Sequence, residues 1–214
     1  PNIAPAFLQA LATSLGVPTE RERYDMPQGV QPEDVLAYVY AVLHAPSYRS
    51  HYADFLKSDF PRIPVAVMGG GAQSFAQIWA ALLPMGRVLI DLHLLRQVPR
   101  QRLAHFPVAG DNVVGKLRYV PGSNSEQGRV YINPTQYFEG VPAATWAFKV
   151  GGYQVCEKWL KDRKGHTLAL TDVEHYSQVV AALGETRTLM ARVDAEANGV
   201  LWSAVAQTEV HACI

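Results

Sequence analysis

The sequence predicts an α+β fold with a helical N-terminal part, a central region of mixed or antiparallel strands, and C-terminal helices that include one long helix. Apolar residues recur at helical spacing up to about residue 86 and again after residue 165. The stretch between them is rich in Val, Tyr, Phe and Trp, which partly alternate with polar residues. Helices and strands that occupy separate parts of a chain indicate an α+β arrangement rather than repeating βαβ units.

The N-terminal part is predicted to be helical. Residues 5–15 have helical composition and are ended by Gly16. A firmer helix starts in QPEDVLAYVYAVLH, where Pro32 suits the first turn and the two acidic residues after it meet the positive end of the helix dipole. SYRSHYADFLKSDF adds an amphipathic turn or two. A further helix covers residues 74–83, and VLIDLHLL extends its pattern beyond Pro84.

The central region contains three strand-like segments, VVGKLRYV, GRVYINPTQYF and ATWAFKVGGY. PGSNSEQG, which separates the first two, is a natural hairpin connection because it is rich in Gly, Ser, Asn and Pro. Within the second segment, INPTQYF is interpreted as a strand end and a turn. We therefore expect strands and tight loops throughout this region.

The C-terminal part is predicted to hold two helices. VCEKWLKDRKG forms a short helix closed by Gly165, with Trp159 anchoring it on the sheet. TDVEHYSQVVAALGETRTLMARVDAEA forms a long one, and Thr171 with Glu174 fits a capping box at its start. Gly151 and Gly152 precede the short helix and predict a sharp turn there.

Composition places the chain among ordinary soluble globular proteins. It has 214 residues, of which 49% are hydrophobic and 18% are charged. Its apolar runs fall short of the roughly 18 residues that would suggest a membrane span. Cys156 and Cys213 are its only cysteines, which favours a reducing cytoplasm. The chain starts at Pro1 rather than Met, so we expect a fragment of a longer polypeptide.

The formal net charge of zero hides an uneven distribution. Residues 87–164 hold twelve basic and six acidic side chains, a net charge of +6. Residues 1–86 carry −2 and residues 165–214 carry −4. Because exposed charges interact over roughly 10 Å, the positive middle can attract phosphate despite its acidic flanks.

The sequence contains no recognisable catalytic motif. MGGGAQS has the glycines of a phosphate loop but lacks the Lys-Ser or Lys-Thr that contacts phosphate and magnesium, which favours a flexible turn. A Gly-x-Ser-x-Gly elbow and the histidine and cysteine spacing of a zinc site are also missing. We expect neither a catalytic residue nor a metal site in this chain.

Basic, amide and aromatic residues cluster in the central region and in the short helix after it. Lysine and arginine neutralise phosphates, while Asn, Gln and Arg read base edges, so this mixture favours a nucleic-acid reader. The alternative is an ordinary solvated helix face. The candidate DNA-contacting residues are Lys116, Arg118, Arg129, Asn133, Gln136, Tyr153, Gln154, Lys158, Lys161, Arg163 and Lys164.

Three long, ordered blocks carry a resemblance to a known family. They are DVLAYVYAVLHAPSYRSHYADFLKSDFPRIP, MGRVLIDLHLL, and the run from GRVYINPTQYFEGVPAATWAFKV to ALGETRTLM. Together they resemble the C-terminal specificity domain of type ISP single-chain restriction-modification enzymes of prokaryotes. The resemblance extends over nearly the whole chain.

The resemblance implies that residues 1–214 form a single DNA target-recognition domain. Residues 1–86 would be its helical scaffold, residues 87–164 its DNA-facing part and residues 165–214 its C-terminal helices. The parent polypeptide would join a nuclease, an ATP-driven helicase-like translocase and an adenine methyltransferase. S-adenosylmethionine, ATP and Mg²⁺ would bind those modules, and this domain would hold no cofactor.

The resemblance also implies the partners of the domain. They are double-stranded DNA and the methyltransferase and helicase-like domains of the same chain, and no membrane is expected to be a partner. Two alternatives remain open at this stage. One is a module that couples translocase to methyltransferase without touching DNA, and the other is a free-standing enzyme.

Overall fold

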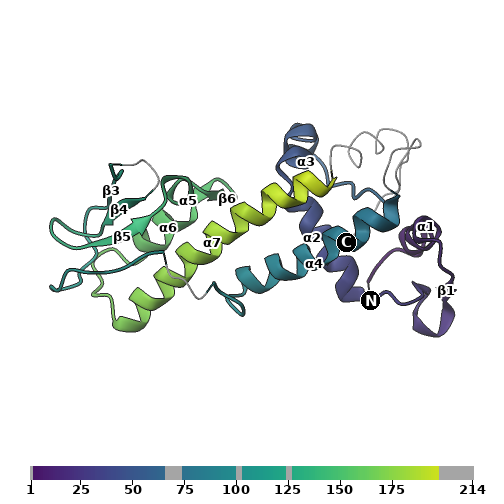
Figure 1. Cartoon of the computed structure of the whole chain (residues 1–214), viewed down its shortest axis with the longest axis horizontal. Coiled ribbons are helices and arrows are strands. Elements are labelled where there is room, and N and C mark those ends of the chain that lie inside the picture. The colour runs from purple at the N-terminus through teal and green to yellow at the C-terminus, as the bar shows by residue number, and fades with distance from the viewer. Residues whose placement is uncertain (1, 66–73, 100–102, 124–126, 198–214) are drawn as a thin grey trace. The chain divides into compact units, whose positions relative to one another are not determined.

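The computed structural model describes residues 2–65, 74–99, 103–123 and 127–197 (Figure 1). The chain forms two compact units. The helical unit comprises Pro1–Ile90 and Thr188–Ile214, and the sheet unit comprises Asp91–Arg187. The glycine triplet at residues 69–71, predicted to be a flexible turn, lies outside the described residues.

Helices dominate the helical unit, as the periodicity predicted. Its elements are α1 (Pro5–Leu15), β1 (Thr19–Glu20), η1 (Arg21–Arg23), β2 (Met26–Pro27), α2 (Pro32–His44), α3 (Pro46–His51), η2 (Phe55–Lys57), most of α4 (Phe75–His93) and the end of α7 (Leu170–Ala197). The predicted start of α2 is confirmed, because the Gln31 N–H donates to the Asp34 carboxylate at 3.0 Å. The helical pattern also continues through Pro84 inside α4, as expected.

Helices α2 and α4 approach each other closely at Gly86. A Cβ at this position would lie 1.8 Å from the carbonyl oxygen of Ala37, so no larger side chain fits without moving a helix. Next to this contact, Arg87 of α4 forms an ion pair with Asp34 of α2. Tyr38 packs on Trp79 with ring centroids 4.7 Å apart. Small and aromatic residues therefore hold this helix pair together.

Helix α4 is the one helix in the described ranges whose length and apolar composition would suit a membrane span. Several of its apolar side chains pack in the core of the helical unit, namely Phe75, Ile78, Trp79, Leu82 and Leu89. The core helix of a globular protein meets the same criteria of length and composition. We therefore describe α4 as a core helix.

The sheet unit combines a three-stranded antiparallel sheet with helices, which confirms the α+β class. Its elements are β3 (Arg118–Val120), β4 (Gly128–Tyr131), β5 (Tyr137–Val141), α5 (Ala143–Trp146), β6 (Lys149–Val150), β7 (Tyr153–Gln154), α6 (Val155–Lys161) and the first part of α7. The strand order is β3-β4-β5, and the predicted β3–β4 hairpin is confirmed. GRVYINPTQYF is two strands joined by a turn, as the reading of INPTQYF indicated.

The prediction of one strand over ATWAFKVGGY is wrong. Pro142 precedes a helical turn, α5, and the stretch contributes two short strands, Lys149–Val150 and the first residue of β7, Tyr153, which pair with each other across a turn. A proline just before a helical turn removes no helical hydrogen bond, because the N–H that it lacks would have no partner within the turn. The predicted sharp turn at Gly151 and Gly152 is confirmed, since their φ angles are +57° and +86°.

The core of the sheet unit lies on one face of the sheet, between the strands and helices α6 and α7. Val130 and Phe138 point into it from neighbouring strands and are completely buried. Phe138 meets Tyr176 of α7 with ring centroids 4.4 Å apart, and Leu160 of α6 joins the same cluster. We call this the inner face of the sheet.

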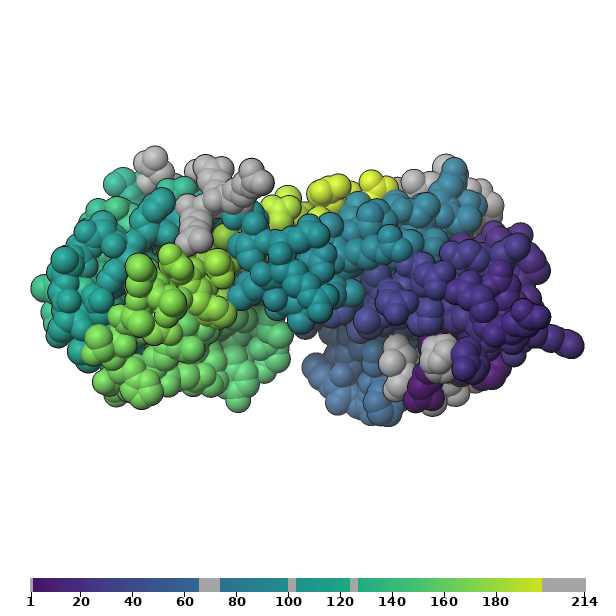
Figure 2. Space-filling view, turned by 90° about the horizontal axis from the view of Figure 1, so that it is seen from below, coloured from purple at the N-terminus to yellow at the C-terminus, as the bar shows by residue number. Residues whose placement is uncertain are grey.

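The segment before β3 is fastened to the loop that leads into α7. The N–H of Leu168 donates to the carbonyl of Asn112 at 2.9 Å, and Val113 pairs with Thr167. Figure 2 shows these teal and yellow-green segments packed side by side on the surface of the sheet unit. The segment therefore has a fixed position although it contains no strand of its own.

The structure adds detail to the predicted C-terminal helices and corrects one feature of them. Trp159 packs against the core of the sheet unit and also lies beside α7, where its ring is 5.7 Å from that of His175 and 5.3 Å from that of Tyr176. The start of α7 is capped by Asp172, which accepts the N–H of Ala169 at 3.0 Å, rather than by a Thr171–Glu174 box. Helix α7 begins at Leu170, earlier than the predicted box allowed.

The buried thiol of Cys156 supplies a test of this core. Desolvation raises its pKa to about 12, so the thiol stays protonated and unreactive at pH 8. We expect a Cys213→Ser variant to resist iodoacetamide when folded and to be alkylated in 6 M guanidinium. Rapid alkylation of the folded variant, followed by mass spectrometry, would contradict the packing described for α6.

Candidate nucleic-acid interface

The outer face of the three-stranded sheet presents arginine and tyrosine side chains. In the strand register, Arg118 lies opposite Tyr131, which lies opposite Tyr137. The next row along the strands consists of Val120, Arg129 and Glu139. Successive residues of a strand point to opposite faces, so these six point away from Val130 and Phe138. Alternation thus separates a polar, aromatic outer face from the apolar core.

Each arginine of the outer face lies over a tyrosine ring. The Cζ of Arg118 is 4.4 Å from the ring centroid of Tyr131, and that of Arg129 is 4.7 Å from Tyr137. The two tyrosine rings are themselves 5.0 Å apart. Stacking holds a guanidinium flat while leaving its N–H groups able to donate. The face therefore offers fixed positive charge together with aromatic surface.

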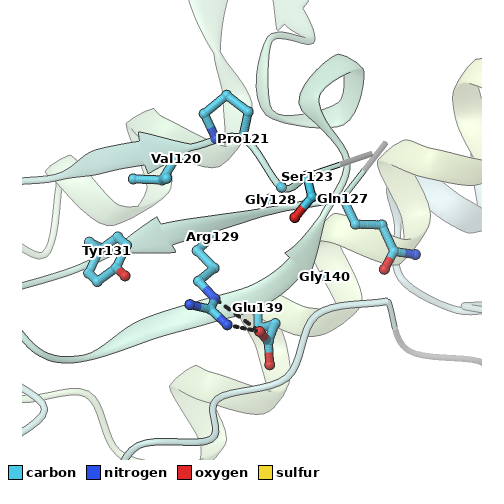
Figure 3. Close-up of a pocket in the computed structure, with 10 residues that line it drawn as sticks. Val120, Pro121, Ser123, Gln127, Gly128, Arg129, Tyr131, Glu139 and Gly140 are labelled. Carbon is cyan, nitrogen blue, oxygen red and sulfur yellow. Dashed lines mark hydrogen bonds and ion pairs between the residues drawn. The ribbon is translucent and has the colours of Figure 1, made fainter. Parts of the chain in front are cut away.

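A pocket of about 430 Å³ opens at one end of this face (Figure 3). Arg129 and Glu139 point toward each other from neighbouring strands, and the Nε and Nη2 of Arg129 donate to Glu139 Oε1 at 2.9 and 2.6 Å. This hydrogen bonding raises the pKa of the guanidinium, which stays charged. The lining residues are Val120, Pro121, Gly122, Ser123, Gln127, Gly128, Arg129, Tyr131, Glu139 and Gly140.

A β-bulge shapes the floor of the pocket. Gly128 pairs with Val141 and Arg129 pairs with Glu139, so Gly140 is left out of the register. Gly140 has a φ of +86°, and a Cβ there would lie 2.2 Å from the carbonyl oxygen of residue 103. Only glycine suits such a position, and the bulge changes the direction of the neighbouring side chain.

Gln136 is buried, which corrects its prediction as a DNA-contacting residue. It is fully inaccessible to solvent, and its Nε2 donates to the Val108 carbonyl at 3.0 Å and to Asn112 Oδ1 at 2.7 Å. Its Oε1 accepts the N–H of Asn112 at 2.8 Å and the Nδ2 of Asn133 at 2.9 Å. A side chain with every hydrogen-bonding group satisfied in the interior cannot reach a base edge.

Asn133 belongs to the same network. Its Nδ2 also donates to the Val113 carbonyl at 3.2 Å, and its Oδ1 accepts the N–H groups of Thr135 and Gln136. The side chain thus closes the turn between β4 and β5 and fastens it to the preceding segment. Its role in the described fold is structural, which argues against the predicted reading of bases.

The cations of α6 lie on the other side of the sheet from the outer face, because Leu160 and Cys156 of this helix pack into the inner core. Lys158 pairs with Asp162 at 2.5 Å, and Lys161 pairs with Glu157 at 2.9 Å. The other two predicted cations of this segment follow the helix. They are Arg163, whose Cζ lies 3.5 Å from the Trp159 ring centroid, and the exposed Lys164.

The β6–β7 hairpin places Tyr153 at its exposed tip and Gln154 at its base. Tyr153 is 63% exposed, and Gln154 pairs with Lys149. The N–H of Val155, the first residue of α6, donates to the Phe148 carbonyl at 3.2 Å. One of the N–H groups at the start of α6 is therefore already used within the fold.

Residues 1–192 match the model of the type ISP C-terminal specificity domain. The chain belongs to this family. No curated protein sequence matches it.

Three solved structures have folds similar to this specificity domain. One is a nuclease-deletion mutant of the type ISP restriction-modification enzyme LlaGI in complex with a DNA substrate mimic, with a TM-score of 0.54, 22% identity and coverage of 76% of this chain and 14% of that one. Another is the ATP-dependent type ISP enzyme LlaBIII bound to DNA, with a TM-score of 0.55 and 17% identity. The match covers 78% of this chain and 11% of the LlaBIII chain. A cryo-electron microscopy structure of a DrdV–DNA complex has a TM-score of 0.57, 23% identity and coverage of 88% and 19%. The specificity domain thus spans less than a fifth of each of these chains.

The structure brings some of the predicted contact residues of the specificity domain together and separates others. Arg118 and Arg129 share the outer face, and the exposed Lys116 precedes β3 by two residues. The residues predicted from the sequence do not include three contributors to this face, Tyr131, Tyr137 and Glu139. Period-two alternation in RVY and YFE could have identified them, because each lies two residues from another outward residue.

Proposed function

We propose that this specificity domain recognises duplex DNA through the outer face of β3, β4 and β5. The observation that carries the proposal is the arginine–tyrosine face, which points away from the core and has a pocket at its end. Sheets and two-stranded ribbons can enter a DNA groove, where arginine contacts phosphates and base edges. The DNA complexes of the similarly folded LlaGI, LlaBIII and DrdV chains support this assignment.

The proposal gives the domain a recognition role and leaves the chemistry to other modules of a longer chain. A nuclease, a helicase-like translocase and an adenine methyltransferase would act upstream, with ATP, Mg²⁺ and S-adenosylmethionine bound there. The family to which the domain belongs supports this division, as does the small share of the solved chains that it spans. An adenine methyltransferase must extrude its target base, and a recognition domain would hold the duplex during that step.

Arg118→Ala is the variant that tests the position of the DNA. Titration of a labelled duplex between low and moderate salt should show weaker binding to every sequence. The slope of log K against log salt should become shallower by about one unit, because one phosphate contact is lost. Arg118 is exposed and forms no ion pair within the described ranges, so the fold should remain intact.

Lys158→Ala is the matched control, because it removes one positive charge from α6 on the other side of the sheet. We expect a smaller change in slope, since this lysine is paired with Asp162 in the free domain. A larger effect for Lys158 than for Arg118 would place the DNA against α6. If the wild-type domain does not bind DNA even at low salt, the result would instead favour a module that couples the other domains without touching DNA.

A further inference from the structure

We infer that Arg129 and Glu139 form a specificity-determining pair that reads one G·C base pair, with Arg129 on guanine and Glu139 on cytosine. The inference rests on the proposed function and adds to it the class of base pair at one position of the recognised site. It arises from the pocket at the end of the outer face and from the way the two side chains share their hydrogen bonds.

The ion pair leaves an acceptor available on the carboxylate. Both donors of Arg129 converge on Oε1 of Glu139, and Oε2 accepts no hydrogen bond from the described residues. An arginine–carboxylate pair that uses two oxygens would occupy both acceptors. Here one carboxylate oxygen orients the guanidinium while the other remains free for a ligand donor.

The backbone beneath the pair is held in place. The N–H of Glu139 donates to the His105 carbonyl at 2.8 Å, and the N–H of His105 donates to the Glu139 carbonyl at 2.9 Å. The bulge at Gly140 fixes the direction of the Glu139 side chain, and Tyr137 supports the guanidinium from below. Side chains that are held in position before binding discriminate between ligands more sharply than mobile ones.

The donor and acceptor pattern of the pair matches one base pair. In the major groove, guanine presents two acceptors, O6 and N7, while cytosine presents the N4 amino donor. Arginine binds the guanine acceptors, and glutamate accepts from cytosine N4. A thymine in place of the cytosine would oppose its O4 acceptor to the carboxylate, with no proton to share. The pair therefore favours G·C and disfavours the A·T pair.

The pocket also admits a base edge on steric grounds. Its volume is about 430 Å³, and Val120 and Pro121 line it with apolar surface. The side chains of Arg129 and Glu139 are 47% and 44% exposed, so a duplex can reach both without a rearrangement of the sheet. An ordinary surface ion pair contributes little to stability, which makes both residues replaceable without unfolding.

The test is selection of bound sequences from a library of random duplexes by the 214-residue chain, followed by sequencing. The wild type should enrich a motif that contains an invariant G·C pair. Glu139→Gln and Arg129→Gln should each reduce the preference at that one position by about 10-fold or more and keep the rest of the motif. Arg118→Ala is the control, which should weaken binding and leave the motif unchanged.

The readout must be the base preference rather than the affinity, because removal of Glu139 also removes a negative charge and strengthens binding to all DNA. Thermal melts followed by circular dichroism should show that both variants unfold at the same temperature as the wild type. An identical motif for the wild type, Glu139→Gln and Arg129→Gln would overturn the inference and leave the proposed function standing. A wild type that enriches no sequence would overturn the proposed function itself.

Discussion

Replacement of Gln136 by alanine is expected to lower the free energy of unfolding of the sheet unit by about 2–4 kcal/mol, because several buried partners lose their hydrogen bonds together. The Val108 carbonyl, the Asn112 N–H and the Asn133 amide would all be left without the bonds that Gln136 provides. The segment before β3 would also loosen, since Gln136 makes three hydrogen bonds to Val108 and Asn112 of this segment.

Urea denaturation followed by tryptophan fluorescence measures this loss, and hydrogen exchange on peptides of residues 103–123 locates it. The matched control is Gln127→Ala, because Gln127 is an exposed residue of the same type in the same unit. Its effect should stay within about 0.5 kcal/mol. Equal stability of the two variants would mean that the amide network contributes nothing, and a changed sequence preference with full stability would restore Gln136 to the interface.

Phe138→Ala should have the largest effect on stability, about 3–5 kcal/mol, because it leaves a cavity where a large aromatic side chain is completely buried. The ring contacts Phe106 at 4.8 Å and Tyr176 at 4.4 Å between centroids, so its loss separates the sheet from α7. A small unit with a stability in the ordinary range of about 5–15 kcal/mol would be close to unfolding.

Tyr137→Ala is the control for Phe138→Ala, because it is the next residue of the same strand and points to the opposite face. It should reduce stability much less and weaken DNA binding by removing the ring beneath Arg129. Thermal melts and duplex titrations on both variants give the two readouts. If Tyr137→Ala unfolded the unit while Phe138→Ala did not, the assignment of inner and outer faces would be reversed.

Much of the fold is predictable from local patterns. The limits of α1 and α2 follow from proline near the start of each helix and from the spacing of apolar residues. ATWAFKVGGY was misassigned because its aromatic residues favour strands in general, whereas Pro142 favours a helical turn there. Sequence pattern alone does not show which of two such local preferences the surrounding structure supports.

The candidate site was only partly predictable, because amide side chains have the same chemistry whether they face DNA or the core. Gln136 and Asn133 look like base readers in sequence, and only their contacts with residues 108–113 show that they hold the β4–β5 turn to the preceding segment. The lysines of α6 form a basic cluster in the sequence, whereas in the fold Lys158 and Lys161 are each paired with a carboxylate four residues away. Arg118 and Arg129 lie together on the candidate face because both belong to strands that the sequence pattern predicts.

Point substitutions and insertions in the three-stranded sheet would have different effects on its two faces. Substitutions at the outward positions of β3, β4 and β5 alter the proposed recognition face without touching Val130 or Phe138. A one-residue insertion within a strand would instead exchange the two faces, burying arginine and exposing phenylalanine. New DNA specificities in this lineage should therefore arise by point substitutions at alternate positions, while strand lengths stay constant among enzymes that recognise different sites.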